Sequence, residues 1–396
     1  MFKPPGILFL LCAFSLSLLG CESKLPKTAE SSLSEKTKPA DETWELNGFV
    51  KVDSLNPILK PDPKPAFNCP LRNESVSWEE RNVLNPSAVV KDGTVYLFYR
   101  AQDAMGTSRI GLATSEDGLN FKKHPEPVFY PDRDSMYTYE WNYRKREMTG
   151  PLEDCKSCYF DGVEDPRIIE DENGTYWMTY TAFDGDKARL SLASSKDLMT
   201  WTKHGLVLKE DQYKDLWSKS GAIIGRLENE TIVATRIAGS YWMYFGDTDL
   251  YLARSEDLLN WQAATDEEKG ELIRVMHPRK GYFDSRLVEP GPFALKTEKG
   301  ILLIYNGSNA ANYGYGGYQK FTYSAGQALF DSEEPFKMVE RTQDDFLHPE
   351  KDYEKVGEVN EVCFVEGLVF FKGKWFLYYG TGDSKIAVAV SNQGPL

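Results

Sequence analysis

The sequence predicts an all-β protein, folded as a five-bladed β-propeller, and three observations support that prediction. Short runs of aromatic and β-branched residues are bounded by Gly, Asp and Asn, which is the pattern of β-strands. No stretch shows the long apolar period of 3.6 residues that a helix would need. A unit of two or three such strands, ending in a Ser-x-Asp turn, recurs along the chain, as repeat folds require.

The repeated unit is present in five copies. The three clearest copies occupy residues 93–121, 174–201 and 239–261, and two weaker ones occupy residues 300–331 and 373–390. Their spacing of roughly 60 to 80 residues is longer than a minimal four-stranded blade and leaves room for functional loops. Five sheets arranged in a ring expose only short, protected edges, which a single β-sandwich would not explain. In the Ser-x-Asp turn we expect a structural role: the Asp caps the turn and the following aromatic packs between blades.

Composition limits the class of partner. The 396 residues include 60 acidic and 46 basic ones, for a net charge of −14. This charge excludes nucleic acid and an anionic membrane surface as the main partner, because both would be repelled. With 41% hydrophobic and 13% aromatic residues, the chain can form a sizeable core. The aromatic content suits strands and the stacking of sugar rings, so a neutral oligosaccharide fits best.

The N-terminus has the pattern of a bacterial lipoprotein signal. Lys3 precedes an apolar run over residues 7–19, and Leu-Leu-Gly leads directly to Cys21. The run is too short to span a bilayer comfortably, so we expect residues 1–20 to be removed and Cys21 to carry lipid. Residues 21–45 then form a flexible tether, and residues 46–396 form the catalytic propeller. The protein is expected to be exported and attached to a bacterial membrane through this anchor; an ordinary secretory signal is the alternative.

The remaining cysteines do not predict a metal centre. Cys12 leaves with the signal, which leaves Cys69, Cys155, Cys158 and Cys363 in the mature chain. The pair Cys155 and Cys158 has no second pair nearby, and the four histidines show no ligand spacing. We therefore expect either a local disulfide or two free thiols there, no metal and no cofactor.

The clearest candidate for chemistry is the charged segment 161–167, which reads Asp-Gly-Val-Glu-Asp-Pro-Arg ahead of the second copy's strand. Charged side chains that face inward from an apolar strand must be paired or hydrogen-bonded. The segment is therefore either part of a site near the propeller axis or an arginine–carboxylate staple between blades. The residue pattern alone leaves both possibilities open.

At this segment the chain resembles glycoside hydrolase family 130, the bacterial β-mannoside phosphorylases and hydrolases. The resemblance covers roughly residues 80–390. It is carried by Asn85-Pro86, Arg100, residues 108–113, residues 115–118, residues 162–167 and residues 378–383. It implies a five-bladed propeller that acts with inversion, in which Asp165 is the general acid. In the phosphorylases of the family, that acid works through a sugar hydroxyl rather than directly on the glycosidic oxygen.

The resemblance also implies a set of residues around the acid. Arg100, Asp103 and Arg109 would bind sugar hydroxyls or order the acid. The full set that we expect to bind substrate is Asn85, Arg100, Asp103, Arg109, Glu164, Arg167, Lys219, Arg236, Asp284, Asn306, Tyr379 and Asp383.

Departures from the phosphorylase pattern favour hydrolysis. A phosphorylase needs basic residues for phosphate, whereas an inverting hydrolase needs a second carboxylate to activate water. Lys219 and Arg236 are present, but the histidines of the phosphorylase pattern are not. Carboxylates stand where that pattern is neutral, and they would repel phosphate. We therefore expect the base among Glu289, Glu361 and Glu366.

Three further points bear on the predicted site and reaction: the alternative role of the glutamates, the location of the protein and two loops. The same glutamates could instead pair with Lys219, Arg236 or Arg286 and hold blades together. A lipoprotein outside the cytoplasm would lose a sugar phosphate product, which again favours hydrolysis. Two loops could line the site or merely pack, namely the aromatic insertion with Tyr137, Tyr139, Trp141 and Tyr143 and the Gly/Tyr loop over residues 309–318.

The sequence thus predicts an inverting hydrolase of β-mannosidic linkages in mannooligosaccharides. The alternatives are a β-mannoside phosphorylase, which would use inorganic phosphate and release mannose 1-phosphate, and a propeller lipoprotein that binds glycan without cleaving it. An arabinan- or fructan-cleaving propeller is the alternative by fold.

Overall fold

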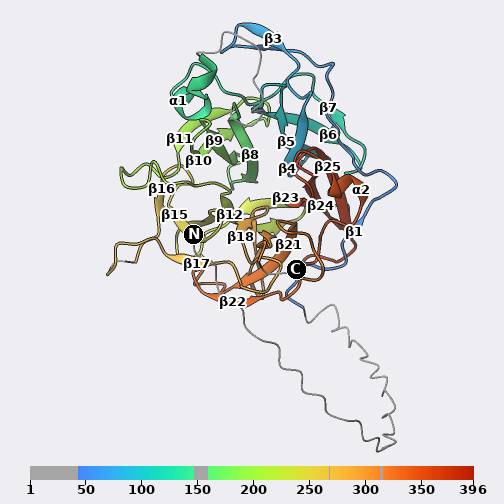
Figure 1. Cartoon of the computed structure of the whole chain (residues 1–396). Helices are drawn as coiled ribbons and strands as arrows, with labels where there is room; N and C mark the ends of the chain where they lie inside the picture. Colours follow the sequence, from blue (N-terminus) through green and yellow to red (C-terminus); the bar gives the residue numbers. More distant parts are fainter. Residues whose placement is uncertain (1–42, 147–158, 267, 313–314) are drawn as a thin grey trace, which may run out of the picture. The chain divides into compact units, whose positions relative to one another are not determined.

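The computed structural model describes residues 43–146, 159–266, 268–312 and 315–396, and it confirms an all-β fold. The antiparallel pairings of these residues form five successive sheets within the compact unit 40–396 (Figure 1). This grouping agrees with the five repeats of the sequence. The first sheet contains β4 (Asn82–Lys91), β5 (Thr94–Gln102), β6 (Thr107–Ser115) and β7 (Lys122–Lys123).

The second and third sheets follow the same order along the chain. The second contains β8 (Asp161–Glu170), β9 (Tyr176–Phe183), β10 (Ala188–Ser195) and β11 (Thr202–Leu206). The third contains β12 (Ala222–Glu228), β13 (Thr231–Ala234), β14 (Tyr241–Phe245), β15 (Leu250–Ser255), β16 (Trp261–Ala263) and β17 (Arg274–Met276).

The fourth and fifth sheets complete the series. The fourth contains β18 (Leu287–Pro290), β19 (Ala294–Thr297), β20 (Gly300–Ser308), β21 (Tyr323–Phe330) and β22 (Met338–Arg341). The fifth contains β23 (Cys363–Phe371), β24 (Lys374–Thr381), β25 (Lys385–Ser391) and β1 (Val50–Lys51). Because β1 pairs with β25, the first strand and the last strand lie in one sheet.

Smaller elements complete the described residues. A two-stranded sheet joins β2 (Phe67–Cys69) and β3 (Glu74–Val76). Three short helices are α1 (Tyr137–Glu140), the 3-10 helix η2 (Tyr143–Arg146) and α2 (Asp352–Lys355). Within the described ranges, no helix is long and apolar enough to cross a membrane.

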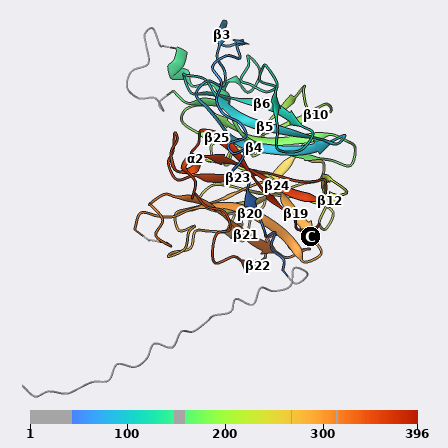
Figure 2. The ribbon, with the colours of Figure 1, turned by 90° about the vertical axis from the view of Figure 1, so that its right-hand side faces the viewer.

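The hydrophobic core lies between neighbouring sheets. Phe98 of the first sheet meets Trp201 of the second edge to face, with centroids 5.8 Å apart. Tyr244 and Phe330 join the third sheet to the fourth at 4.7 Å. Figure 2 shows the fifth sheet between the first and the fourth. Aromatic pairs of this kind bury large areas and fix the sheets relative to one another.

The Ser-x-Asp turns are structural, as the sequence predicts. In the first copy, Asp117 Oδ1 accepts hydrogen bonds from Ser115 Oγ at 2.8 Å and from the backbone N–H of Asn120 at 2.7 Å. The second and third copies, at Asp197 and Asp257, repeat these contacts. The carboxylate satisfies backbone donors that the tight turn would leave unpaired.

An irregularity in the inner strands positions the functional side chains. The pairing register shifts at Leu84/Pro86 in β4, at Glu164/Arg167 in β8 and at Val365/Gly367 in β23. Each shift is a β-bulge, which leaves one residue out of the ladder and redirects a side chain. A proline suits such a site because it has no N–H to donate. Figure 1 places β4, β8, β12, β18 and β23 toward the middle of the sheets.

Candidate active site

Charged side chains from the strands and adjoining loops of all five sheets come together near these bulges. Asn85 and Asp165 occupy equivalent bulges and have positive φ values of 47° and 49°, and Ser220, directly before β12, has 59°. Such backbone conformations are strained for residues other than glycine and concentrate at functional sites. We call the resulting group the axial cluster; it consists of Asn85, Arg100, Glu164, Asp165, Arg167, Lys219, Ser220, Glu289, Glu366 and Asp383.

Asp165 lies at the centre of the axial cluster. Its Oδ1 accepts a hydrogen bond from Asn85 Nδ2 at 2.8 Å and lies 3.3 Å from Arg100 Nη1. Its Oδ2 lies 3.1 Å from Lys219 Nζ. The carboxylate side chain has 0% exposed surface, whereas that of Lys219 has 17%. Lys219 therefore separates Asp165 from solvent in this conformation.

The charges around Asp165 set its protonation. Burial works to raise the pKa of Asp165, but the cations of Lys219 and Arg100 outweigh it and hold the pKa below its ordinary value. The adjacent Glu164 behaves differently: desolvation raises its pKa to about 7, with Arg100 opposing. Near neutral pH, Glu164 is therefore partly protonated while Asp165 is ionised, so any proton shared by the two carboxyls lies on Glu164 in the free protein.

Glu289 shares Lys219 with Asp165. Its Oε1 lies 3.0 Å from Lys219 Nζ and accepts a hydrogen bond from Ser220 Oγ. Burial raises the pKa of Glu289, and Lys219 opposes that rise. A carboxylate with a raised pKa is a stronger base once it is ionised. Glu289 can therefore take a proton at this position. The nearby Lys219 favours the ionised form of Glu289.

Glu366 is a weakly paired member of the axial cluster. Neither of its carboxyl oxygens has a hydrogen-bond partner among the described residues, and its side chain has 0% exposed surface. Its nearest cation is Arg167, with Nη2 at 3.6 Å from Oε2. Arg167 is itself held by the backbone carbonyls of Pro290 and Gly291, at 2.7 and 2.6 Å. Burial consequently raises the pKa of Glu366 well above its ordinary range.

Arg100 connects the first two sheets at the rim of the cluster. Its Nη2 lies 2.5 Å from Glu164 Oε1, and its Nε donates to Ser108 Oγ at 3.0 Å. Ser108 Oγ donates to the same Glu164 oxygen at 3.1 Å. Desolvation raises the pKa of Asp383 to about 6, against the nearby Arg100. Five carboxyl groups thus face three cations, and desolvation by burial raises the pKa of four of these carboxyls.

Several predicted site residues lie elsewhere. Arg109 and Asp103, expected to bind sugar, form a buried ion pair at 3.0 Å, and Arg109 also donates to Cys69 Sγ. Arg109 is 1% exposed, so it has no free surface for a sugar hydroxyl. Arg236 lies at an exposed turn, where it donates to the carbonyls of Gly239 and Glu256. The structure therefore places these three side chains outside the axial cluster.

The fourth and fifth sheets use three other predicted residues as structural contacts. Asp284 is fully buried, with Arg279 Nη2 at 2.7 Å and Arg341 Nη2 at 2.5 Å. Asn306 bonds both backbone groups of Val365 and so joins β20 to β23. Tyr379 donates its hydroxyl to Glu354 at 2.9 Å. Each polar group is satisfied inside the fold, so the structure corrects their assignment as substrate ligands.

Glu361, a predicted base candidate, is also separate from Asp165. It is half-buried and accepts a hydrogen bond from Gln319 at 3.0 Å. The structure therefore leaves Glu289 and Glu366 as the carboxyls beside Asp165.

Sequence reasoning missed three members of the site region. Ser108 and Ser220 contact carboxylates directly, and Ser108 belongs to the segment 108–113 on which the family resemblance rests. Tyr323 lies near Glu289 and Asp383, and burial raises its pKa to about 12. No local signal identified Tyr323, because its place depends on how β21 packs against the fifth sheet.

The two loops expected near the site mainly pack. In the aromatic insertion, Trp141 is buried beneath Lys145, and Tyr139 lies under Arg189, whereas Tyr143 is 57% exposed. In the Gly/Tyr loop, Tyr315 and Tyr318 donate to Asp344 and Asp345.

The remaining predictions concern the signal segment, the cysteines and metal binding. The signal segment, Cys21, Cys155 and Cys158 lie outside the described residues. Cys69 and Cys363 are free and buried. In the described part of the chain, no three His, Cys, Asp or Glu side chains are grouped to hold a metal ion.

The raised pKa values predict that the protein is more stable at pH 6 than at pH 8. Burial raises the pKa of Glu140 and of Glu164 to about 7, and that of Asp383 to about 6. Each carboxyl is protonated more readily in the folded than in the unfolded chain, so its contribution is present at low pH and lost as pH rises through the folded pKa. Burial lowers the pKa of His204, so this group alone would make the folded protein less stable as the pH falls.

Melting temperatures at pH 8, 7 and 6 measure this effect. We expect Tm to rise as pH falls over this interval, and Glu140→Gln, remote from the axial cluster, to remove part of the rise. Asp165 does not contribute to this change of Tm with pH, because between pH 6 and pH 8 it is ionised in both the folded and the unfolded chain. A Tm that falls from pH 8 to pH 6 would contradict the assigned protonation states.

Comparison with known proteins decides the family. The family model described as beta-1,4-mannooligosaccharide phosphorylase, glycoside hydrolase family 130, matches residues 51–394. The chain belongs to glycoside hydrolase family 130. Members of this family are enzymes that process mannosides, either phosphorylases or hydrolases, so the chain is a glycoside-processing enzyme.

Relatives of both kinds resemble this family 130 enzyme. The 1,2-beta-oligomannan phosphorylase of Thermoanaerobacter sp. (strain X514) is 29% identical over 83% of this chain and 94% of its own. A glycosyl hydrolase from Bacteroides ovatus is 38% identical, with a TM-score of 0.82 over 89% of this chain and 96% of that one. A second structure is described by the statement that the GH130 family of mannoside phosphorylases contains glycoside hydrolases that target β-1,2 mannosidic linkages in Candida mannan. It is 39% identical, with a TM-score of 0.82 over 89% of this chain and 96% of that one.

Proposed function

We propose that this enzyme hydrolyses β-1,2-mannosidic linkages of mannooligosaccharides with inversion. The observation that supports hydrolysis most strongly is the carboxylate environment of Lys219, which lies 3.1 Å from Asp165 and 3.0 Å from Glu289. A phosphate ion at this cation would meet both carboxylates at close range and be repelled. The β-1,2 linkage is supported by the descriptions of the Thermoanaerobacter phosphorylase and of the structure that is 39% identical.

In this proposal Asp165 is the general acid and Glu289 the general base. Glu289 accepts a proton from water, whose oxygen forms a bond to the anomeric carbon as the glycosidic carbon–oxygen bond breaks. The leaving oxygen receives its proton from Asp165 through a sugar hydroxyl. This relay suits the buried position of Asp165, because a hydroxyl can approach a recessed carboxyl that a glycosidic linkage cannot reach directly.

The acid must first acquire a proton, since Asp165 is ionised in the free enzyme. Glu164 is the source in this proposal, because its pKa of about 7 leaves it partly protonated at neutral pH. Substrate hydroxyls that displace Lys219 from Asp165 would raise the pKa of Asp165 and move the shared proton onto it.

Phosphorolysis is the second candidate, and the observation that favours it is the activity named for the curated relatives, which are phosphorylases. Against it stands the scarcity of free cations in the axial cluster. Arg167 is engaged by backbone carbonyls, and Arg236 lies at an exposed turn.

A substrate panel tests the proposed linkage. We expect release of mannose from β-1,2-mannobiose and its longer homologues, and at least about tenfold lower kcat/KM for β-1,4-mannobiose, because a misplaced acceptor sugar loses the alignment that catalysis needs. Arabinan and fructan oligosaccharides serve as controls and are expected to remain intact. Cleavage of these controls in preference to mannosides would contradict the proposal.

A further inference from the structure

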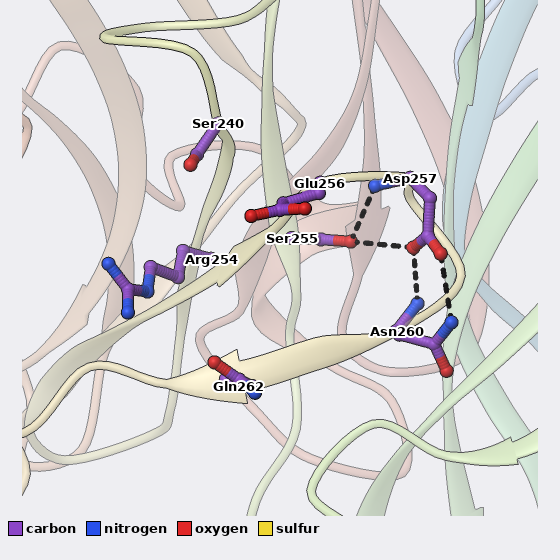
Figure 3. Close-up of a pocket in the computed structure, with 7 residues that line it drawn as sticks. All are labelled: Ser240, Arg254, Ser255, Glu256, Asp257, Asn260 and Gln262. Atoms are coloured by element: carbon purple, nitrogen blue, oxygen red, sulfur yellow. Dashed lines mark hydrogen bonds between the residues drawn. The ribbon is translucent and has the colours of Figure 1, made fainter.

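Away from the axial cluster, the outer part of the third sheet has three cavities whose linings share residues. One cavity of about 340 Å³ lies over β15 and β16 and includes Arg254 and Gln262 in its lining (Figure 3). The same two residues line a second cavity of about 380 Å³, which also reaches Trp242 and Phe336. A third cavity, of about 600 Å³, shares residues with the second. We call the first two cavities the rim groove and define it by Trp242, Arg254, Gln262 and Phe336.

The strand register explains why these side chains form one surface. Trp242 of β14 pairs with Arg254 of β15, and Arg254 pairs with Gln262 of β16. Residues that pair across neighbouring strands project from the same face of a sheet. In Figure 3, Arg254 and Ser240 lie on one side of the pocket, and the hydrogen-bonded turn from Ser255 to Asn260 lies on the other.

The rim groove offers both kinds of contact that a sugar chain uses. The indole of Trp242 is fixed by a hydrogen bond from Nε1 to the carbonyl of Ile237 at 3.1 Å, and Phe336 is 46% exposed. Aromatic surfaces of this kind cover the apolar C–H faces of sugar rings. Arg254 and Gln262 are exposed, and neither side chain has a hydrogen-bond or ion-pair partner in the described parts of the chain. Their planar groups can meet two neighbouring hydroxyls.

We propose that the rim groove is a second, non-catalytic binding site for a neutral mannooligosaccharide chain. A neutral ligand fits because Glu256 and Glu210 line the same cavities as Arg254, so no single charge dominates. A chain of several sugars fits because the cavities follow one another through shared residues. The sugar identity rests on the proposed function. Engagement of one chain at both the groove and the axial cluster would increase apparent affinity for long substrates only.

The test uses the full chain carrying Arg254→Ala together with Gln262→Ala. Both side chains are exposed, so we expect the variant to fold, with the Tm of the parent. Its KM for long β-1,2-mannooligosaccharides is expected to rise at least about tenfold with unchanged kcat, whereas its kinetics on mannobiose stay those of the parent. Arg133→Ala, which removes an exposed arginine outside the groove, is the matched control and is expected to change neither. An unchanged KM for long chains would overturn the inference.

A binding measurement separates failure of this inference from failure of the proposed function. In native gels that contain long β-1,2-mannan, we expect the parent and Arg133→Ala to be retarded and the double variant to migrate faster. Equal mobility of all three proteins would overturn the inference even if mannobiose is hydrolysed. Retardation that depends on Arg254 and Gln262 would support it even if no mannoside is cleaved.

Discussion

Asp165→Asn is expected to lower kcat for β-1,2-mannobiose by about 10²- to 10⁴-fold, the range that a general acid contributes. The amide has nearly the same shape as the carboxyl and keeps an oxygen that can accept the bond from Asn85, which measures 2.8 Å. It cannot, however, deliver a proton to the leaving group. Sugar binding, measured by calorimetry, is expected to remain close to that of the parent.

Asp284→Asn is the matched control for this prediction. Asp284 is likewise a fully buried carboxylate next to two cations, Arg279 and Arg341, but it lies outside the axial cluster. Its replacement is expected to lower the free energy of unfolding, because it weakens a buried ion pair, and to leave kcat unchanged at temperatures where the variant is folded. If Asp165→Asn loses binding and stability as well as turnover, Asp165 is a structural staple between sheets.

Glu289→Gln is expected to have the second large effect, a fall in kcat of about 10²- to 10⁴-fold, because the amide cannot accept a proton from water. The other two glutamates give a graded comparison. Glu366→Gln replaces a carboxyl whose pKa burial raises well above its ordinary range, so that its protonated form is favoured, and we expect a change in kcat of less than about tenfold. Glu361→Gln alters a half-buried residue outside the axial cluster and is expected to leave kcat unchanged.

The order of these three losses identifies the base. A loss that is largest in Glu361→Gln would show that the substrate reaches a part of the chain other than the axial cluster. A loss that is largest in Glu366→Gln would make Glu366 the base and require it to ionise when the substrate binds.

The strands and their grouping into sheets could be predicted from the sequence because they are local and repeated. Alternating aromatic and β-branched runs produce strands whatever their neighbours are, and the Ser-x-Asp turns carry their own hydrogen bonds, as at Ser115 and Asp117. Asp165 could be predicted because its segment combines a family motif with charges before an apolar strand.

The membership of the site was harder to predict because adjacent strand residues point to opposite faces. Ser108 reaches Glu164 in the axial cluster, whereas its neighbour Arg109 points away and pairs with Asp103. A family segment that includes both residues does not say which of them faces the axis. The β-bulges complicate the pattern further, since each shifts the alternation by one residue, as at Asp165.

Buried charge also made the site hard to predict. The family resemblance implied that Asp284 and Arg109 bind substrate. In the structure their partners are Arg341 and Asp103, which belong to the fold itself. A sequence pattern shows that such a charge must be paired, but only the packing of the sheets decides whether the pairing group is protein or ligand.

Hydrolysis rather than phosphorolysis is the central claim, and product analysis tests it most directly. The enzyme is incubated with β-1,2-mannobiose in the presence and in the absence of inorganic phosphate, and mannose and mannose 1-phosphate are quantified separately. We expect free mannose as the only product, formed at a rate that does not depend on phosphate, because Lys219 is already paired with Asp165 and Glu289. Mannose 1-phosphate that forms only when phosphate is present would contradict the claim and make Lys219 part of a phosphate site.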